Sequence, residues 1–216
     1  MIRGMRKVLP WLLALVASLA LAGTPLAAPL NIWAAHAAVR TAGPTTPYWT
    51  VVWPVGNVVV TTVLLVLATV GRRRRAAERL AAWGLFALGL CVEAGSKHLG
   101  LGSAAATLTR IPRPGPPAAA VTDVTHAVSK LLPGGLYAAA RSRLHLVGTF
   151  PSGHVWRLTF VAGYALRRPG WVLPAVVAAL AGFAVVVRAG HALTDALGGA
   201  MLAMALLAWA GRLRAR

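Results

Sequence analysis

Hydrophobic residues along the chain gather into six runs, separated by short segments rich in arginine, proline and glycine. The runs cover residues 8–22, 48–70, 80–101, 150–166, 171–187 and 192–210. Several of them approach or exceed the roughly 20 residues that a bilayer-spanning helix needs. The pattern therefore predicts an all-α polytopic membrane protein. We expect six transmembrane helices that form a helical-bundle core, in a single domain covering residues 1–216.

The first run allows two interpretations. Basic residues precede it, and small residues follow it at Leu26-Ala27-Ala28, as in a cleaved signal peptide. Alternatively, residues 1–28 contain a first spanning helix that stays in the protein, which we favour because it completes an even set of six. In both cases the next segment lies outside the cytoplasm. Residues 29–40 there can form a helix with Trp33 at the membrane interface.

Composition and charge support the membrane interpretation. The chain has 58% apolar and only 12% charged residues, which is too apolar for an ordinary soluble domain. Its net charge is +18, and many of its arginines cluster at the ends of the apolar runs, as in residues 72–75, 167–168 and 212–216. This placement is typical of cytoplasmic flanks, so we expect contact with anionic membrane lipids in a plasma membrane and no binding of nucleic acid.

The first candidate chemistry lies in residues 188–195, which read Arg-Ala-Gly-His-Ala-Leu-Thr-Asp. On a helix, His191 and Asp195 share one face because they are four residues apart. The carboxylate can then hold one ring nitrogen of the histidine and leave the other free to attack or to bind a metal. Asp195 is one of only four acidic residues, and ionisable groups in apolar surroundings indicate a functional site.

A second candidate opens the fourth apolar run, as Pro151-Ser152-Gly153-His154. A helix that begins here offers free backbone N–H groups, a hydroxyl and the positive end of the helix dipole, which together suit an anion. Glycine lets a phosphate approach the backbone closely. Two histidines can divide phosphoryl transfer between them, one attacking phosphorus and the other protonating the leaving oxygen.

Glu93 and Lys97 are also four residues apart, with the acid first, which favours an ion pair on a helix. Either the two charges merely neutralise each other, or Lys97 is held pointing into a site. If every arginine-dense end is cytoplasmic, Lys97, His154, Arg188 and His191 all fall at the same outer face.

These residues resemble three motifs of the type-2 phosphatidic acid phosphatase and vanadium haloperoxidase superfamily. The motifs are a lysine followed by Arg-Pro, then Pro-Ser-Gly-His, then an arginine before His-x-x-x-Asp. The resemblance covers Lys97 to about Gly199. It implies that His191 is the nucleophile forming a phosphohistidine, that Asp195 orients it, and that His154 is the general acid and then the base. It implies no metal and no cofactor, and it assigns phosphate binding to Lys97, Ser152, Gly153 and nearby arginines.

The first motif departs from the family pattern. Fifteen residues, 98–112, separate Lys97 from Arg113-Pro114, where the family usually has six. Arg110 is closer but is followed by isoleucine. A longer loop still closes at modest entropic cost, so we keep both arginines as phosphate-binding candidates and prefer Arg113.

The third motif departs as well. The family arginine lies six residues before the histidine, which is Val185 here. Arg188 is one helical turn later, and Arg157 could supply the charge from the neighbouring helix. The alternative is that Arg157 extends toward the membrane surface and that Arg188 only ends the fifth span.

The sequence therefore predicts an integral-membrane, metal-independent lipid phosphatase with its active site on the extracytoplasmic side. Its substrate would be a phosphate monoester or pyrophosphate on a lipid, such as phosphatidic acid, phosphatidylglycerol phosphate or a polyprenyl diphosphate. The alternative is an inactive relative that binds or transports lipid phosphates. A metal site at His191 and Asp195 has too few further ligands. The lipid and the oligomeric state stay open.

Overall fold

The computed structural model describes residues 2–43, 49, 53–70, 75–102, 148–166, 171–187 and 190–214. Within these residues the chain forms seven α-helices and one 3-10 helix, and no strand. The elements are α1 (Ile2–Ala22), α2 (Ala27–Ala42), η2 (Trp53–Gly56), α4 (Val58–Val70), α5 (Ala76–His98), α9 (Gly153–Leu166), α10 (Val172–Val187) and α11 (Leu193–Arg214). The predicted all-α class is confirmed for this part of the chain.

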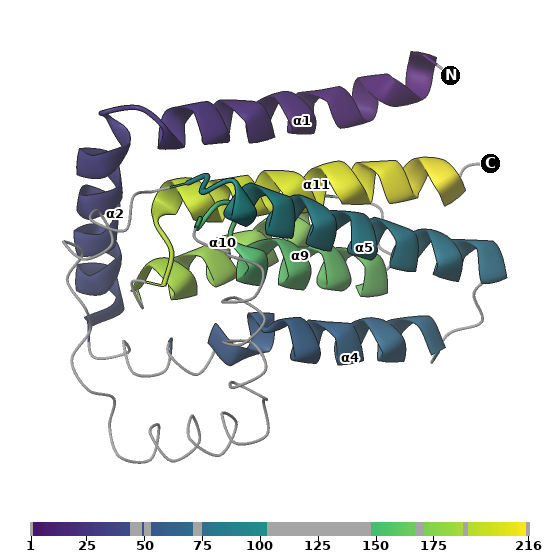
Figure 1. Ribbon diagram of the computed structural model, residues 1–216. Coiled ribbons are helices and arrows are strands. Elements are labelled where there is room, and N and C mark those ends of the chain that lie inside the picture. Colours follow the sequence, from purple (N-terminus) through teal and green to yellow (C-terminus); the bar gives the residue numbers. More distant parts are fainter. Residues whose placement is uncertain are drawn as a thin grey trace.

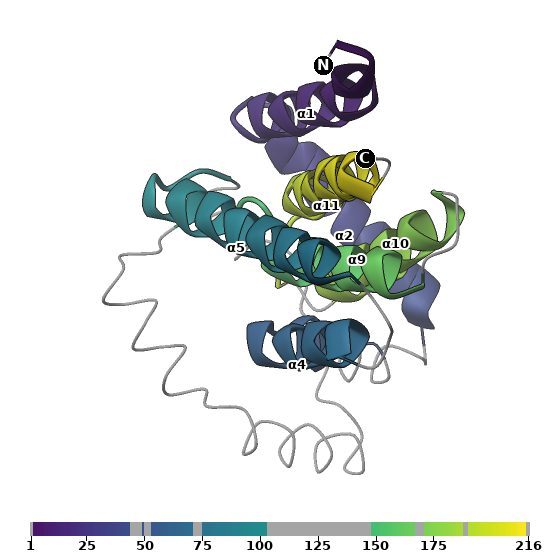
Figure 2. The same cartoon turned by 90° about the vertical axis from the view of Figure 1, so that its right-hand side faces the viewer.

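Helices α1, α4, α5, α9, α10 and α11 run in roughly the same direction or its reverse, and α2 lies across one end of them (Figure 1). A bend of 99° separates α2 from α1. Figure 2 shows α9 in the middle of the bundle, where it packs against α4, α5, α10 and α11. The residues that follow α5 and α10 and those that precede α9 and α11 meet at the end covered by α2.

Helix α9 is central because it is apolar on nearly every side, as expected for a fully buried helix. Val155, Trp156 and Phe160 are all 0% exposed. Its aromatic rings continue into α5, where Phe86 lies 5.3 Å from Trp156 between ring centroids. Tilted aromatic pairs at this separation add to the packing energy of the core.

The prediction of six membrane-spanning helices is wrong for the part of the chain that the structure describes. Two helices there, Ala76–His98 and Leu193–Gly211, are long and apolar enough to cross a membrane, or three if the bent pair of α1 and α2 counts as one span. Helices α4, α9 and α10 have 13, 14 and 16 residues. At 1.5 Å per residue they reach about 20–24 Å, short of a hydrocarbon core of roughly 30 Å.

The surface is nevertheless compatible with membrane association. Large apolar side chains are exposed on several helices, including Leu13 at 60%, Leu67 at 62% and Val172 at 77%. Helix α2 lies across the bundle with Trp33 62% exposed.

We expect Phe160→Ala to lower the free energy of unfolding by about 3 kcal/mol, because it leaves a cavity at the centre of the core. Thermal unfolding of the purified protein in detergent measures this. The control is Leu67→Ala on α4, whose side chain is exposed and whose loss should change stability by less than about 0.5 kcal/mol. Equal effects of the two substitutions would contradict the central position of α9.

Candidate active site

The segments before α9 and at the start of α11 are joined directly. The backbone N–H of Ser152 donates to the carbonyl of Asp195 at 2.8 Å. Two glycines of α11 make this approach possible. A Cβ on Gly199 would lie 2.6 Å from the carbonyl oxygen of Ser152, and one on Gly198 would overlap the ring of Phe150. The Pro151–His154 segment and the first turns of α11 are therefore in direct contact.

Two imidazoles face each other at this junction. The rings of His154 and His191 lie 6.1 Å apart between centroids and are inclined by 59°. His191 is 8% exposed, and the backbone of Gly56 in η2 packs against His154, where a Cβ would lie 2.7 Å from the histidine Cβ. The two imidazoles are therefore near enough for both to reach one phosphoryl group.

Asp195 does not hold His191 by a hydrogen bond. Its Oδ2 lies 3.9 Å from Nδ1 of His191, within ion-pair range but beyond a hydrogen bond. The same oxygen accepts from the backbone N–H of Ala192 at 3.3 Å. Helix α11 begins at Leu193, so His191 precedes the helix, and Asp195 instead caps the helix in the manner of a capping box. The spacing argument from a shared helix face therefore does not apply here.

Ser152 is the N-cap of α9, and its carbonyl accepts from the N–H of Trp156. Its side chain is 0% exposed, and its Oγ has no hydrogen-bond partner among the described residues. The first N–H groups of a helix have no intrahelical acceptor either. The amino end of α9 therefore places a buried hydroxyl together with the positive end of a helix dipole, as an anion site requires.

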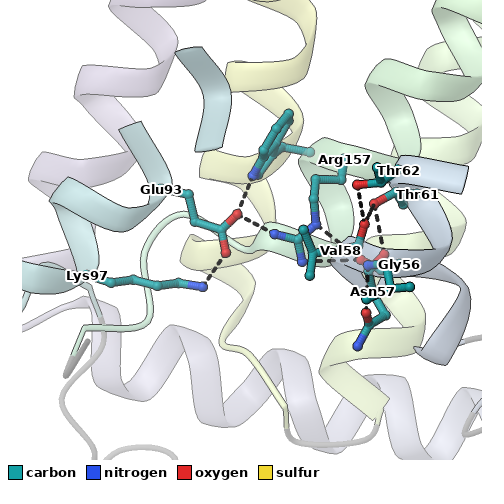
Figure 3. A network of polar contacts seen from close by, with 10 residues as sticks. Gly56, Asn57, Val58, Thr61, Thr62, Glu93, Lys97 and Arg157 are labelled. Carbon is teal, nitrogen blue, oxygen red and sulfur yellow. Dashed lines mark hydrogen bonds and ion pairs between the residues drawn. The ribbon is translucent and has the colours of Figure 1, made fainter. Parts of the chain in front are cut away.

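A buried carboxylate links α5 to α9 (Figure 3). Glu93 is 7% exposed and accepts from Lys97 Nζ at 2.5 Å and from Trp156 Nε1 at 2.8 Å. It also forms an ion pair with Nη1 of Arg157. The predicted ion pair between Glu93 and Lys97 is thus observed, and the carboxylate has a second and a third donor atom within reach only because α9 packs on α5.

Arg157 is buried, at 5% exposure, and so does not extend toward the membrane surface. Beyond Glu93, its Nη2 donates to the carbonyl of Gly56 at 3.2 Å. Gly56 directly precedes Asn57, whose side chain caps α4 by accepting from the N–H of Val59 at 2.9 Å. The guanidinium therefore connects α9 to the start of α4, as Figure 3 shows.

Gly153 has to be glycine because the carboxylate of Glu93 lies against it. A Cβ at this position would overlap Oε1 of Glu93 and come within 2.6 Å of Nη1 of Arg157. The Glu93 carboxylate thus reaches the amino end of α9, where the sequence predicts a phosphate. Lys97 and Arg157, both candidates for phosphate binding, meet at this same point.

Helix α2 is attached to the same region by Asn31, which is 1% exposed. Its Nδ2 donates to Oγ1 of Thr194 at 3.3 Å, and its Oδ1 accepts from the N–H of Thr194 at 3.2 Å. The sequence analysis missed this contact because Asn31 and Thr194 are 163 residues apart. The only indication of this contact in the sequence was an asparagine among the apolar residues of a predicted helix.

The structure brings most of the predicted site residues together. The ones it places at this end of the bundle are Lys97, Ser152, Gly153, His154, Arg157, His191 and Asp195. Arg110, Arg113 and Arg188 lie outside the described residues. Within those residues, no three histidine, cysteine or acidic side chains are grouped as metal ligands. The contribution of Glu93 to binding both cations was missed, although its spacing from Lys97 was noticed.

Comparison of the chain with protein-family models, with curated proteins and with solved structures gave no match in any of the three.

We expect Glu93→Ala to destabilise the protein by about 3–5 kcal/mol, because it leaves two buried cations without their counter-ion. Thermal unfolding in detergent measures the loss. Adding Lys97→Met to the same chain should restore part of the stability, since one unpaired cation is then removed. An unchanged unfolding temperature in Glu93→Ala would show that the ion cluster does not join α5 to α9.

Gly153→Ala should disrupt the same cluster, because the added methyl group overlaps a carboxylate that several donors hold in place. A matched control is Gly95→Ala on α5, where a Cβ would meet nothing within 4 Å. At an exposed helical position, replacing glycine by alanine raises the free energy of unfolding by at most about 1 kcal/mol. We expect a lower unfolding temperature for Gly153→Ala and an unchanged or higher one for Gly95→Ala. The reverse order would argue against this packing.

Proposed function

We propose that this protein is an integral-membrane lipid phosphatase. It removes phosphate from a monoester or pyrophosphate on a lipid, such as phosphatidic acid, phosphatidylglycerol phosphate or a polyprenyl diphosphate. The observation that carries the proposal is the pair of facing imidazoles, His154 and His191, 6.1 Å apart beside the amino end of a helix. Two imidazoles at this separation supply a nucleophile and a general acid to one phosphorus.

The reaction has two steps. Nδ1 of His191 faces Asp195, so Nε2 is the atom that attacks phosphorus. The bond from phosphorus to the lipid oxygen breaks, and His154 gives its proton to that oxygen. Water then attacks the phosphohistidine, while His154 accepts a proton from it. The products are inorganic phosphate and the lipid, which keeps a hydroxyl or, from a diphosphate, one phosphate group.

The local charge favours a phosphoryl group. Lys97 and Arg157 carry two positive charges against the one negative charge of Glu93, so the cluster keeps a net positive charge. Fixed cations and helix N–H groups stabilise the negative charge that develops on phosphoryl oxygens during transfer. The buried hydroxyl of Ser152 adds a donor at the same place.

We place the site at the extracytoplasmic face of a plasma membrane, with membrane lipids around the bundle. The support for this is the positive charge on the flanks of the apolar runs and the position of α2 across the end that carries the histidines.

A second function has its own support. In an inactive relative that only binds lipid phosphates, Asp195 would not need to orient His191, and the 3.9 Å separation agrees with this. Catalytic hydrogen bonds are often long in the absence of substrate, so this distance does not outweigh the facing imidazoles. The inactive relative binds lipid phosphate without turnover.

Phosphate release from phosphatidic acid by the purified protein, in the presence of a chelator, tests the proposal. His154→Ala should lower kcat by about 10²–10⁴-fold, and His191→Ala should abolish the phosphoenzyme. Vanadate should compete, since it mimics the transition state. The control is His36→Ala on α2, an exposed histidine that should leave the rate unchanged. Equal rates for His191→Ala and the unsubstituted protein would reject the phosphatase, and vanadate-sensitive binding without turnover would favour the inactive relative.

A further inference from the structure

An apolar groove of about 610 Å³ lies between α1, α2, α10 and α11. Small side chains line much of it, including Ala37, Ala179 and Ala200, and Trp11, Trp33 and Phe183 add aromatic side chains to the lining. None of the described residues that line it is charged. A polar occupant would leave its own groups without hydrogen-bond partners there, so the chemistry of the lining selects hydrocarbon.

The groove reaches the candidate active site. Leu193 and Ala196 line it and flank Thr194 and Asp195 in the first turn of α11. On α10, Val186 lines it just before the turn in which the N–H of His191 is bonded to the carbonyl of Val185. A molecule lying in the groove therefore ends beside the segment that carries His191.

The size of the groove limits what fills it. Its volume falls within the roughly 300–1,000 Å³ of small-molecule sites. One hydrocarbon chain can lie inside a groove of this volume, whereas a helix about 10 Å across could only rest on its opening. Met201 and Met204 on α11 add flexible, polarizable surface that adapts to a chain of variable shape.

We propose that this groove binds one hydrocarbon chain of the lipid substrate and that α2 closes it on the side of the active site. The inference rests on the proposed function, since it assigns the tail of the same lipid whose phosphate lies between the histidines. The hydrogen bonds between Asn31 and Thr194 attach α2 to the residue before Asp195. The substrate class is therefore a lipid with at least one long alkyl or isoprenoid chain, held along α10 and α11.

The test fills the groove and compares chain lengths. Ala179→Phe and Ala200→Leu each add volume to its lining, on α10 and α11 respectively. The substrates are dioleoyl and dibutyryl phosphatidic acid, which share a headgroup. The ratio of their kcat/KM values should fall about tenfold in both variants, since contacts to about two methylene groups are lost. The matched control is Ala87→Phe, an exposed alanine on α5 away from the groove, which should keep the ratio of the unsubstituted protein.

A second measurement does not depend on turnover. Phosphatidic acid with a diazirine at the end of one acyl chain is photolysed with the full-length protein, and the labelled peptides are identified by mass spectrometry. We expect labelling of α10 and α11 that both filled variants lose and that Ala87→Phe keeps. Two results would overturn the proposal that the groove binds the chain. One is labelling spread evenly over all exposed helices, and the other is an unchanged ratio of the two kcat/KM values in both filled variants. No hydrolysis of either substrate, together with groove-specific labelling, would reject the phosphatase but support the groove as a binding site for the lipid chain.

Discussion

The buried carboxylate of Glu93 is the constraint on which this end of the molecule depends. A charge removed from water needs partners of opposite charge and complete hydrogen bonding. Glu93 obtains both from its own helix, through Lys97, and from α9, through Trp156 and Arg157. These contacts determine how α9 lies along α5. They also explain the absence of a side chain at position 153.

Close backbone approach is the second requirement. Gly198 and Gly199 lie under Phe150 and Ser152, so the start of α9 can rest on the first turns of α11. Small residues at a contact between apolar helices commonly serve this purpose. Here they bring the N-cap of one helix within hydrogen-bonding distance of the other. The proximity of the two imidazoles follows from that contact.

Much of the fold could be predicted from the apolar runs, but the number of spans could not. Hydropathy measures composition and does not locate the ends of helices. In the run at residues 48–70, the described part is a 3-10 helix, η2, followed by α4 from Val58. Likewise, the helix expected over residues 29–40 is present as α2, but its bend of 99° from α1 was indicated by no local pattern. A broken or bent run has the same average hydropathy as a straight one.

The sequence by itself determined what is local: the helical class, the helix start at Ser152-Gly153, and the pairing of Glu93 with Lys97 across one turn. Only the tertiary structure decided which distant groups share those charges. Arg157 reaches Glu93 across 64 residues of sequence, and Asn31 reaches Thr194 across 163. The role of Asp195 also depended on where α11 begins. Because Asp195 lies in the first turn of that helix, its carboxylate caps the helix and does not hold His191. Local periodicity describes one helix at a time, whereas desolvated charges are satisfied by whichever helices pack together.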